Sequence, residues 1–376
     1  MGFFLFGGFR TVYPLFLQIN LNYSEYEVIS NWAFIYSIGL MIGFLTRLPI
    51  GLITDRFSPT KSLSLAFFLC LTSVLGLFFT NSIIILAILF GLLRTGAHIF
   101  PMLARAYVLE NSRSVYGRLN GWLMLMSNLG QIIGPIILTF FLEISVTGMI
   151  LTTSVFMAFS IVLLIIFFPK TNFETNISFR SIFRSSKNEI YDLKILIWFF
   201  LLAGIFNGIA NSLIVPYLSF FFFLSPSVVG IIVGVIQLIN IFLILISGEL
   251  IDKFGVKFAV IIGIIMNGLA GFLIYFTLSN FYLFVFAQIL LIGGVSIIMT
   301  SSTTQIALTA SKKSFASTFG TISGFSFLGT AVAPYFASNL YLINPTLPFL
   351  LIGVIAVISL SAAFIGNYKK KIITSF

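Results

Sequence analysis

Residues 51–57 read GLITDRF, and residues 248–254 read GELIDKF. The two segments share a glycine, an aspartate, a basic residue and a phenylalanine in the same order, 197 residues apart, and each follows a long apolar stretch. A second pattern, G-x-x-x-[GA]-P, occurs at 130–135 and again at 329–334, with an offset of 199 residues. Two patterns with nearly one offset indicate that the chain consists of two related halves.

The composition is that of a membrane protein. Of the 376 residues, 59% are apolar and 8% are charged, and the mean hydropathy is +1.13. Soluble domains carry about 25% charged residues. Thirty charged side chains cannot cover a soluble protein of this size, which excludes a soluble enzyme and a disordered chain.

The apolar residues come in blocks of about 20, the length that spans about 30 Å of hydrocarbon as a helix. They predict twelve transmembrane helices, at 2–21, 31–53, 61–80, 82–105, 117–142, 147–168, 194–220, 227–250, 257–278, 280–305, 315–340 and 346–367. The fold class is therefore an all-α membrane protein with two pseudo-symmetric six-helix bundles. We expect an N-terminal bundle at 1–168, a cytoplasmic linker at 169–193 and a C-terminal bundle at 194–376.

The basic residues predict the orientation. Sixteen of the 20 Lys and Arg fall in the even-numbered loops, the linker and the C-terminal tail, whereas the odd-numbered loops hold only Glu25, Glu27 and Glu143. By the positive-inside rule, both termini are cytoplasmic and the protein is a multi-pass protein of the cell membrane. The net charge of +10 thus reflects topology and predicts no nucleic-acid partner. Tryptophans near span ends predict an aromatic belt, formed by Trp32, Trp122 and Trp198.

Reactive side chains are scarce. Cys70 is the one cysteine and His98 the one histidine, so we expect no disulfide within the chain, no metal site and no cofactor. An intramembrane protease would need a Ser–His or Asp–Asp set, and no aspartate lies in the middle of a span. We therefore expect a monomeric protein that is not an enzyme, with a small solute and the lipid bilayer as its partners.

The repeated segments resemble the loop motif of the major facilitator superfamily, roughly G-x-L-x-D-R-x-G-R-K/R, and the resemblance covers essentially the whole chain. The first copy matches at Gly51, Leu52, Asp55, Arg56 and Lys61, although Ser58-Pro59 replaces the usual glycine. The second copy fits more closely and matches at Gly248, Asp252, Lys253, Gly255 and Lys257. The resemblance implies a transporter that works by alternating access.

The resemblance also implies gating residues. In the family, the loop aspartate docks at the N-terminus of an opposite helix when the cytoplasmic side closes, where free N–H groups stabilise a carboxylate. Asp55 would meet span 11 near Ser314, Asp252 would meet span 5 near Ser114, and the motif glycines would let helices approach closely. A solvated loop that only caps helices is the alternative. The expected gating residues are Gly51, Asp55, Arg56, Gly248, Asp252 and Lys253.

Span 5 carries a further family-like pattern, Gly130-x-x-x-Gly134-Pro135. We expect these three residues to form a bendable point, a hinge in span 5. In the family this pattern accompanies exchangers and exporters, which favours an alternative function for this chain, a proton-coupled multidrug or metabolite efflux antiporter. The usual trailing glycines are missing here.

Four arginines lie inside the predicted spans: Arg10, Arg47, Arg94 and Arg105. Arg47 and Arg105 are close to inner ends and can snorkel to the interface. Arg10 and Arg94 are near the middles of spans 1 and 4, which line the central cavity in the family. Because no Asp or Glu occupies the middle of a span, we expect the two guanidinium groups to bind an anionic group of the solute. Structural bonds to backbone carbonyls are the open alternative.

Other polar residues complete the expected site. His98 lies about 40° from Arg94 around an ideal helix, and it is the mid-span group whose ordinary pKa allows proton exchange near neutrality. The expected substrate-binding residues are Arg10, Arg94, His98, Gln131, Asn207 and Asn211. The function expected is a secondary active transporter of a small organic or inorganic anion. The identity of the solute, the direction of transport and the use of protons as coupling ion stay open.

Overall fold

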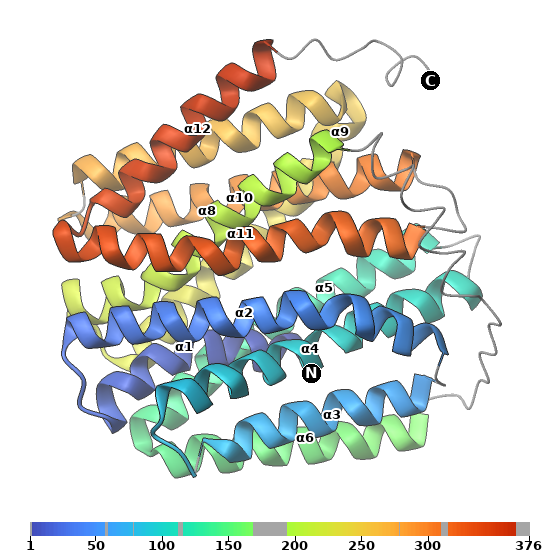
Figure 1. The fold of residues 1–376 in the computed structure, drawn as a ribbon, viewed down its shortest axis with the longest axis vertical. Helices are drawn as coiled ribbons and strands as arrows, with labels where there is room; N and C mark the ends of the chain where they lie inside the picture. Colours follow the sequence, from blue (N-terminus) through green and yellow to red (C-terminus); the bar gives the residue numbers. More distant parts are fainter. Residues whose placement is uncertain are drawn as a thin grey trace.

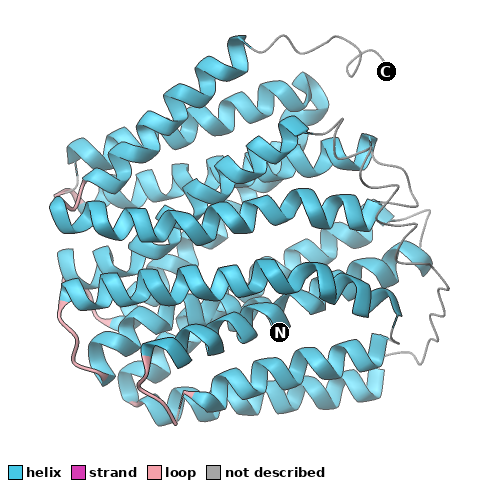
Figure 2. Cartoon of the chain, in the orientation of Figure 1, coloured by secondary structure: helices cyan, strands magenta, loops and turns pink. Residues whose placement is uncertain are grey.

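The computed structural model describes residues 2–56, 59–77, 79–111, 116–167, 194–277, 279–309 and 315–365. Within them the regular elements are all helical (Figures 1 and 2). The first half contains α1 (Gly2–Asn20), α2 (Glu25–Arg56), α3 (Pro59–Gly76), α4 (Ile83–Asn111), α5 (Tyr116–Ile144) and α6 (Val146–Phe167). The second half contains α8 (Lys194–Pro216), η1 (Tyr217–Phe221), α9 (Pro226–Thr277), α10 (Phe281–Thr309), α11 (Phe315–Ile343) and α12 (Leu347–Ile365). The predicted linker at 169–193 lies outside the described residues.

Gly255 divides α9 into two membrane spans. Its backbone has φ of 82° and ψ of 164°, a conformation that is essentially restricted to glycine. The segments on either side correspond to the eighth and ninth predicted spans. With this break, each of the twelve predicted spans has a helix in the part of the chain that the structure describes, and the predicted fold class is confirmed.

The two halves repeat the same helix contacts. In the first half α1 packs on α5 and α2 on α4; in the second half α8 packs on α11 and α9 on α10. The halves meet where α2 lies along α11 and where α5 lies along α9 (Figure 1). The two junctions are equivalent under the internal repeat, because each joins the second span of one half to the fifth span of the other.

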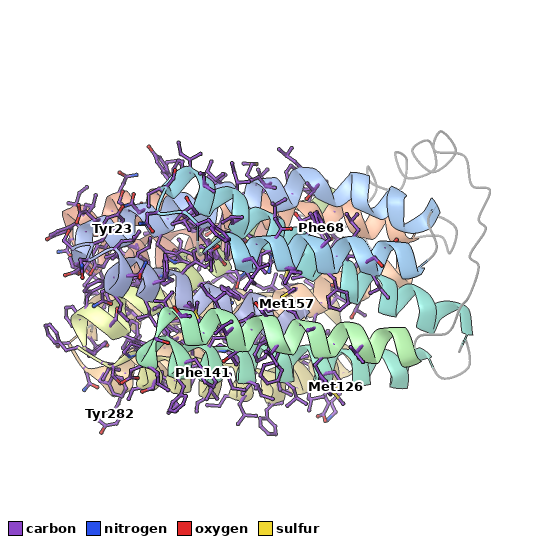
Figure 3. All side chains as sticks on the ribbon, turned by 90° about the horizontal axis from the view of Figure 1, so that it is seen from below. Tyr23, Phe68, Met126, Phe141, Met157 and Tyr282 are labelled. Carbon is purple, nitrogen blue, oxygen red and sulfur yellow. The ribbon has the colours of Figure 1, made fainter. Side chains whose placement is uncertain are left out.

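One end of the molecule, on the left in Figure 1, carries the described loops at 21–24, 79–82, 145, 222–225, 279–280 and 344–346. We call it the odd-loop end, and the opposite end the even-loop end. Apolar side chains cover the flanks between the two ends (Figure 3), and Phe68 and Met126 are exposed there. Four of the helical segments are long and apolar enough to cross a membrane: Glu25–Thr46, Leu196–Phe221, Pro226–Thr277 and Phe281–Ile306.

Two local predictions need correction. The helix α2 begins at Glu25, six residues before the expected start, because the carboxylate of Glu27 accepts hydrogen bonds from the N–H and the hydroxyl of Ser24, at 2.9 and 2.7 Å. This capping arrangement stabilises a helix start ahead of the apolar run. Trp32, expected in an aromatic belt, is fully buried against Tyr13 and Tyr36, whereas Trp198 is exposed.

Candidate functional site

The two mid-span arginines both lie within electrostatic range of Tyr36. Arg10 projects from α1 and Arg94 from α4, and both lie close enough to Tyr36 of α2 to interact with it electrostatically. Arg10 is buried, and the Tyr36 ring packs in tilted geometry against Trp32 and Phe90, whose ring centres are 5.0 and 5.6 Å away. The first half thus holds two positive charges beside one buried phenol.

Arg94 also reaches the second half. Its guanidinium carbon lies 4.9 Å from the centre of the Phe327 ring on α11, a cation–π contact. Its aliphatic chain passes over Gly43 of α2, where an added methyl group would lie 3.2 Å from Cγ of Arg94. Arg94 therefore contacts α2 in its own half and α11 in the other half, at the junction of the two bundles.

The predicted amides lie on other helices. In α8, the side-chain amide of Asn211 donates a hydrogen bond of 2.9 Å to the backbone carbonyl of Asn207, and it also contacts the side-chain oxygen of Asn207. Asn211 is buried and Asn207 is half-buried. Gln131 is half-buried on α5, where its Cα faces Gly7 of α1. His98 belongs to α4, but its side chain lies outside the described part of the structure.

In the sequence, all ten acidic residues lie at predicted span ends or in predicted loops, so none shares the predicted mid-span depth of the two arginines. A charge removed from water needs charged or hydrogen-bonding groups around it. The electrostatics of this region therefore favour negatively charged or strongly hydrogen-bonding groups.

The predicted gating residues are only partly described. Gly51, Asp55 and Arg56 fall in the last turns of α2, and their surroundings lie outside the described residues, as do Ser114 and Ser314. Asp252 and Lys253 are exposed near the break in α9.

Among the described residues, no atom makes the close helix approach predicted at Gly248 in this conformation. A methyl group added there would meet no described atom within 4 Å. The reason lies in the course of α9. This helix crosses α5 near its odd-loop end, where a methyl group on Gly230 would lie 2.8 Å from the Pro135 carbonyl oxygen, and Gly248 lies five turns farther along α9.

In span 5, the motif marks a close crossing. The helix α5 is continuous through Pro135, and a methyl group on Gly134 would lie 3.0 Å from the backbone nitrogen of Gly8 in α1. Gly130, one turn earlier, is half-buried. The hinge remains a prediction, and the packing on α1 is a second reason for glycine at position 134.

Two hydrogen bonds between the halves were missed by sequence reasoning. The backbone N–H of Ser227, at the start of α9, donates to Oε2 of Glu143 at the end of α5, at 3.0 Å. The hydroxyl of Tyr341, at the end of α11, donates to Oε1 of Glu25 at the start of α2. The sequence shows both glutamates as loop charges, and only the alignment of the two repeats could have paired these helix ends.

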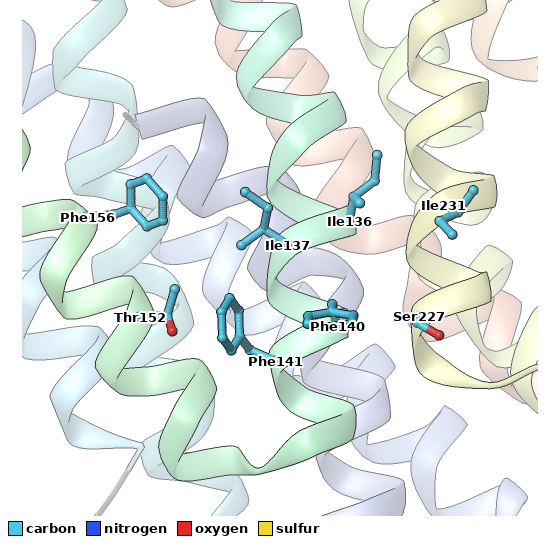
Figure 4. A pocket seen from close by; sticks show the side chains of 8 residues that line it. All are labelled: Ile136, Ile137, Phe140, Phe141, Thr152, Phe156, Ser227 and Ile231. Atoms are coloured by element: carbon cyan, nitrogen blue, oxygen red, sulfur yellow. The ribbon is translucent and has the colours of Figure 1, made fainter.

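An apolar groove lies beside the first of these bonds (Figure 4). It has a volume of about 390 Å³ and is formed by α5 and α6 of the first half and α9 of the second. Its lining consists of Ile136, Ile137, Phe140, Phe141, Thr152, Phe156, Ser227 and Ile231. The groove therefore spans the junction between the halves.

Comparisons with known proteins agree with the repeat. Residues 1–221 and residues 196–373 each match the family model described as Major Facilitator Superfamily. Among solved structures, the nucleoside transporter NupG aligns with a TM-score of 0.74 at 15% identity, over 98% of this chain and 97% of its own. A variant of NupG gives a TM-score of 0.78 at 15% identity, over 97% and 96% of the two chains. The xylose transporter XylE from E. coli gives 0.70 at 16% identity, over 98% and 96%.

Identities this low show the fold alone. A search of curated protein sequences gave no significant match.

Proposed function

The chain belongs to the major facilitator superfamily, and from this premise we propose that it is a secondary active transporter for a small organic or inorganic anion. It is an integral membrane protein of the transporter fold, built from two six-helix halves. The proposal adds the chemistry of the solute. An anionic group binds to Arg10 and Arg94, and the solute crosses the cell membrane by alternating access.

The observation that carries the proposal is the position of Arg94. Transporters built from repeats bind their solutes near mid-depth, between the repeats. Arg94 contacts α2 and Phe327 of α11, and Arg10 approaches the same Tyr36. A planar guanidinium can hold a carboxylate or phosphate in two parallel hydrogen bonds. A solute bound there would contact Arg94, whose own contacts depend on how the two halves are arranged.

The remaining predicted residues would give the site its selectivity. Asn207, Asn211 and Gln131 offer neutral hydrogen bonds from the second half and from α5. His98 would add a group that exchanges protons near neutrality, so that protons could serve as the coupling ion. The protein would act as a monomer, without cofactor.

Gating at the even-loop end would use the predicted motif residues. The positive-inside rule assigns the even-loop end and both termini to the cytoplasm. There, the six motif residues would close the cytoplasmic side in the opposite conformation, and span 5 would bend at Gly130, Gly134 and Pro135. The exposure of Asp252 supports a cytoplasmic side that is not closed at this point of the structure.

A second candidate is the proton-coupled efflux of hydrophobic drugs or metabolites. The groove between α5, α6 and α9 favours it, because an apolar compound could enter there from the bilayer. Its volume of about 390 Å³ suits a small ligand, since such sites measure about 300–1,000 Å³.

A ligand panel separates the two candidates. The purified protein is heated with carboxylates, phosphate, sulfate, a nucleoside, xylose and hydrophobic cations, at two pH values. The anion proposal predicts that anions raise the melting midpoint of the parent and of a Lys369→Gln control, but not that of Arg94→Gln. Stabilisation by hydrophobic cations alone, unaffected by Arg94→Gln, would favour the efflux candidate.

A further inference from the structure

We infer that Glu143–Ser227 and Glu25–Tyr341 form a paired latch that closes the odd-loop end. The inference rests on the proposed alternating access, but not on the identity of the solute. Neither the repeated loop motif nor the span 5 pattern includes the four residues of the latch. The two acceptors of the latch, Glu25 and Glu143, lie at the end opposite to the predicted cytoplasmic gates.

The first bond places a carboxylate at two helix ends at once. Glu143 lies in the last turn of α5, where the helix dipole disfavours a negative charge. Ser225 precedes α9 and its carbonyl accepts a hydrogen bond from the N–H of Val229 at 3.0 Å, whereas Pro226, the first residue of α9, has no N–H. The N–H of Ser227 is therefore the first free donor of α9. The Glu143 carboxylate is well placed electrostatically only while α9 is docked against α5.

The second bond joins the other two helix ends. Glu25 is the first residue of α2, where a negative charge is favourable, and its Oε1 accepts from the Tyr341 hydroxyl. The Tyr341 side chain is 1% exposed, and its ring lies 5.2 Å from that of Tyr217. A hydrogen bond to a charged group is stronger when its donor is held in place and shielded from water.

The two bonds are related by the repeat. One joins the end of the fifth span of the first half to the start of the second span of the second half. The other joins the end of the fifth span of the second half to the start of the second span of the first half. The acid belongs to the first half in both cases. Because the bonds lie at the two junctions α5–α9 and α2–α11, parting the halves at this end must break both.

The latch stabilises one of two conformations. Contacts that exist in only one state shift a two-state equilibrium by their full free energy. Removing either bond should therefore raise the population in which the odd-loop end is open. Loss of the partly buried Glu25–Tyr341 bond corresponds to roughly a tenfold change in that population, and loss of the exposed Glu143–Ser227 bond to roughly a threefold change.

Cysteine accessibility tests the latch directly. In a Cys70→Ala background, Ala337→Cys reports on α11 one turn below Tyr341, at a position that is 0% exposed. The labelling rate with a hydrophilic maleimide is measured on the full chain in nanodiscs. The latch predicts that Glu25→Ala and Tyr341→Phe, which remove the partly buried bond, each raise this rate about tenfold, and that Glu143→Ala, which removes the exposed bond, raises it about threefold.

Two control variants change residues at the odd-loop end without removing either hydrogen bond of the latch. Glu27→Gln removes a neighbouring charge that bonds Ser24 of its own half, and Ser227→Ala keeps the backbone N–H that binds Glu143. Both should label at the parent rate. Monodisperse elution confirms folding, and Val28→Cys on α2 provides a second reporter.

Equal labelling in the parent and all three latch variants would overturn the inference, as would an equal rise in the controls. The outcome is separate from the fate of the transport proposal. If the latch variants label faster but the protein binds no anion, the latch is retained and the anion proposal is rejected. If the protein transports an anion but the latch variants label at the parent rate, the anion proposal is retained and the latch is rejected.

Discussion

The guanidinium carbon of Arg94 lies 4.9 Å from the centre of the Phe327 ring, so a charge carried by the first half rests on an aromatic face of the second. This contact lies at the α2–α11 side of the molecule, since Arg94 also passes over Gly43 of α2. An anion that binds Arg94 would compete with or reinforce this contact. Under the proposed function, anion binding and the junction between the halves would be coupled through this one side chain.

Replacing Phe327 tests that coupling. Phe327→Leu removes the ring while keeping an apolar side chain, and the loss of a partly shielded cation–π contact costs about 0.5–2 kcal/mol. We expect a lower melting midpoint without ligand. Phe327→Tyr keeps the ring face and should melt like the parent. If the leucine and tyrosine variants melt together, the contact contributes nothing to stability.

Alanine substitutions at two glycines of α9 should have different effects on the melting midpoint. A methyl group on Gly230 would lie 2.8 Å from the Pro135 carbonyl oxygen and would overlap the Thr139 hydroxyl, so Gly230→Ala should cost about 1–3 kcal/mol through overpacking. Gly248→Ala meets no described atom within 4 Å and should not lower the melting midpoint. The motif role proposed for Gly248 predicts slower transport all the same. Normal transport by Gly248→Ala would contradict that role.

The break in α9 depends on Gly255. A side chain at φ of 82° and ψ of 164° is strained, and such conformations cost about 1–3 kcal/mol. Gly255→Ala should therefore lower the melting midpoint, whereas Gly248→Ala, seven residues earlier in regular helix, serves as the control. An unchanged midpoint for Gly255→Ala would mean that the backbone relaxes at this break without cost.

The sequence was sufficient for the helices because their signal is local. Blocks of about 20 apolar residues and one repeat offset predicted the twelve spans, and the start of α2 was misplaced only because the Ser24–Glu27 cap was overlooked. The contacts between helices carry no such signal. Ser227 and Glu143 are 84 residues apart, and Tyr341 and Glu25 are 316 residues apart.

The arginines show the same limit. Their depth in the spans follows from counting residues, whereas no sequence pattern marked Tyr36 as the residue whose electrostatic surroundings include both arginines. Phe327 could not be found as a partner, because one phenylalanine among 46 has no distinguishing pattern. Trp32 was misassigned for a related reason, since nearness to a span end does not tell whether a side chain faces lipid or the bundle.

The central claim is that Arg10 and Arg94 hold the anionic group of a transported solute. It is tested most directly by the uptake of the anion that gives the largest thermal stabilisation, into proteoliposomes containing the parent, Arg10→Ala, Arg94→Ala or a Lys369→Gln control in the C-terminal tail. The account predicts that both arginine variants lose at least about tenfold in uptake rate, as expected when a charge-assisted contact is removed, while the control retains the parent rate. Uptake of every tested anion at the parent rate by both arginine variants would contradict it.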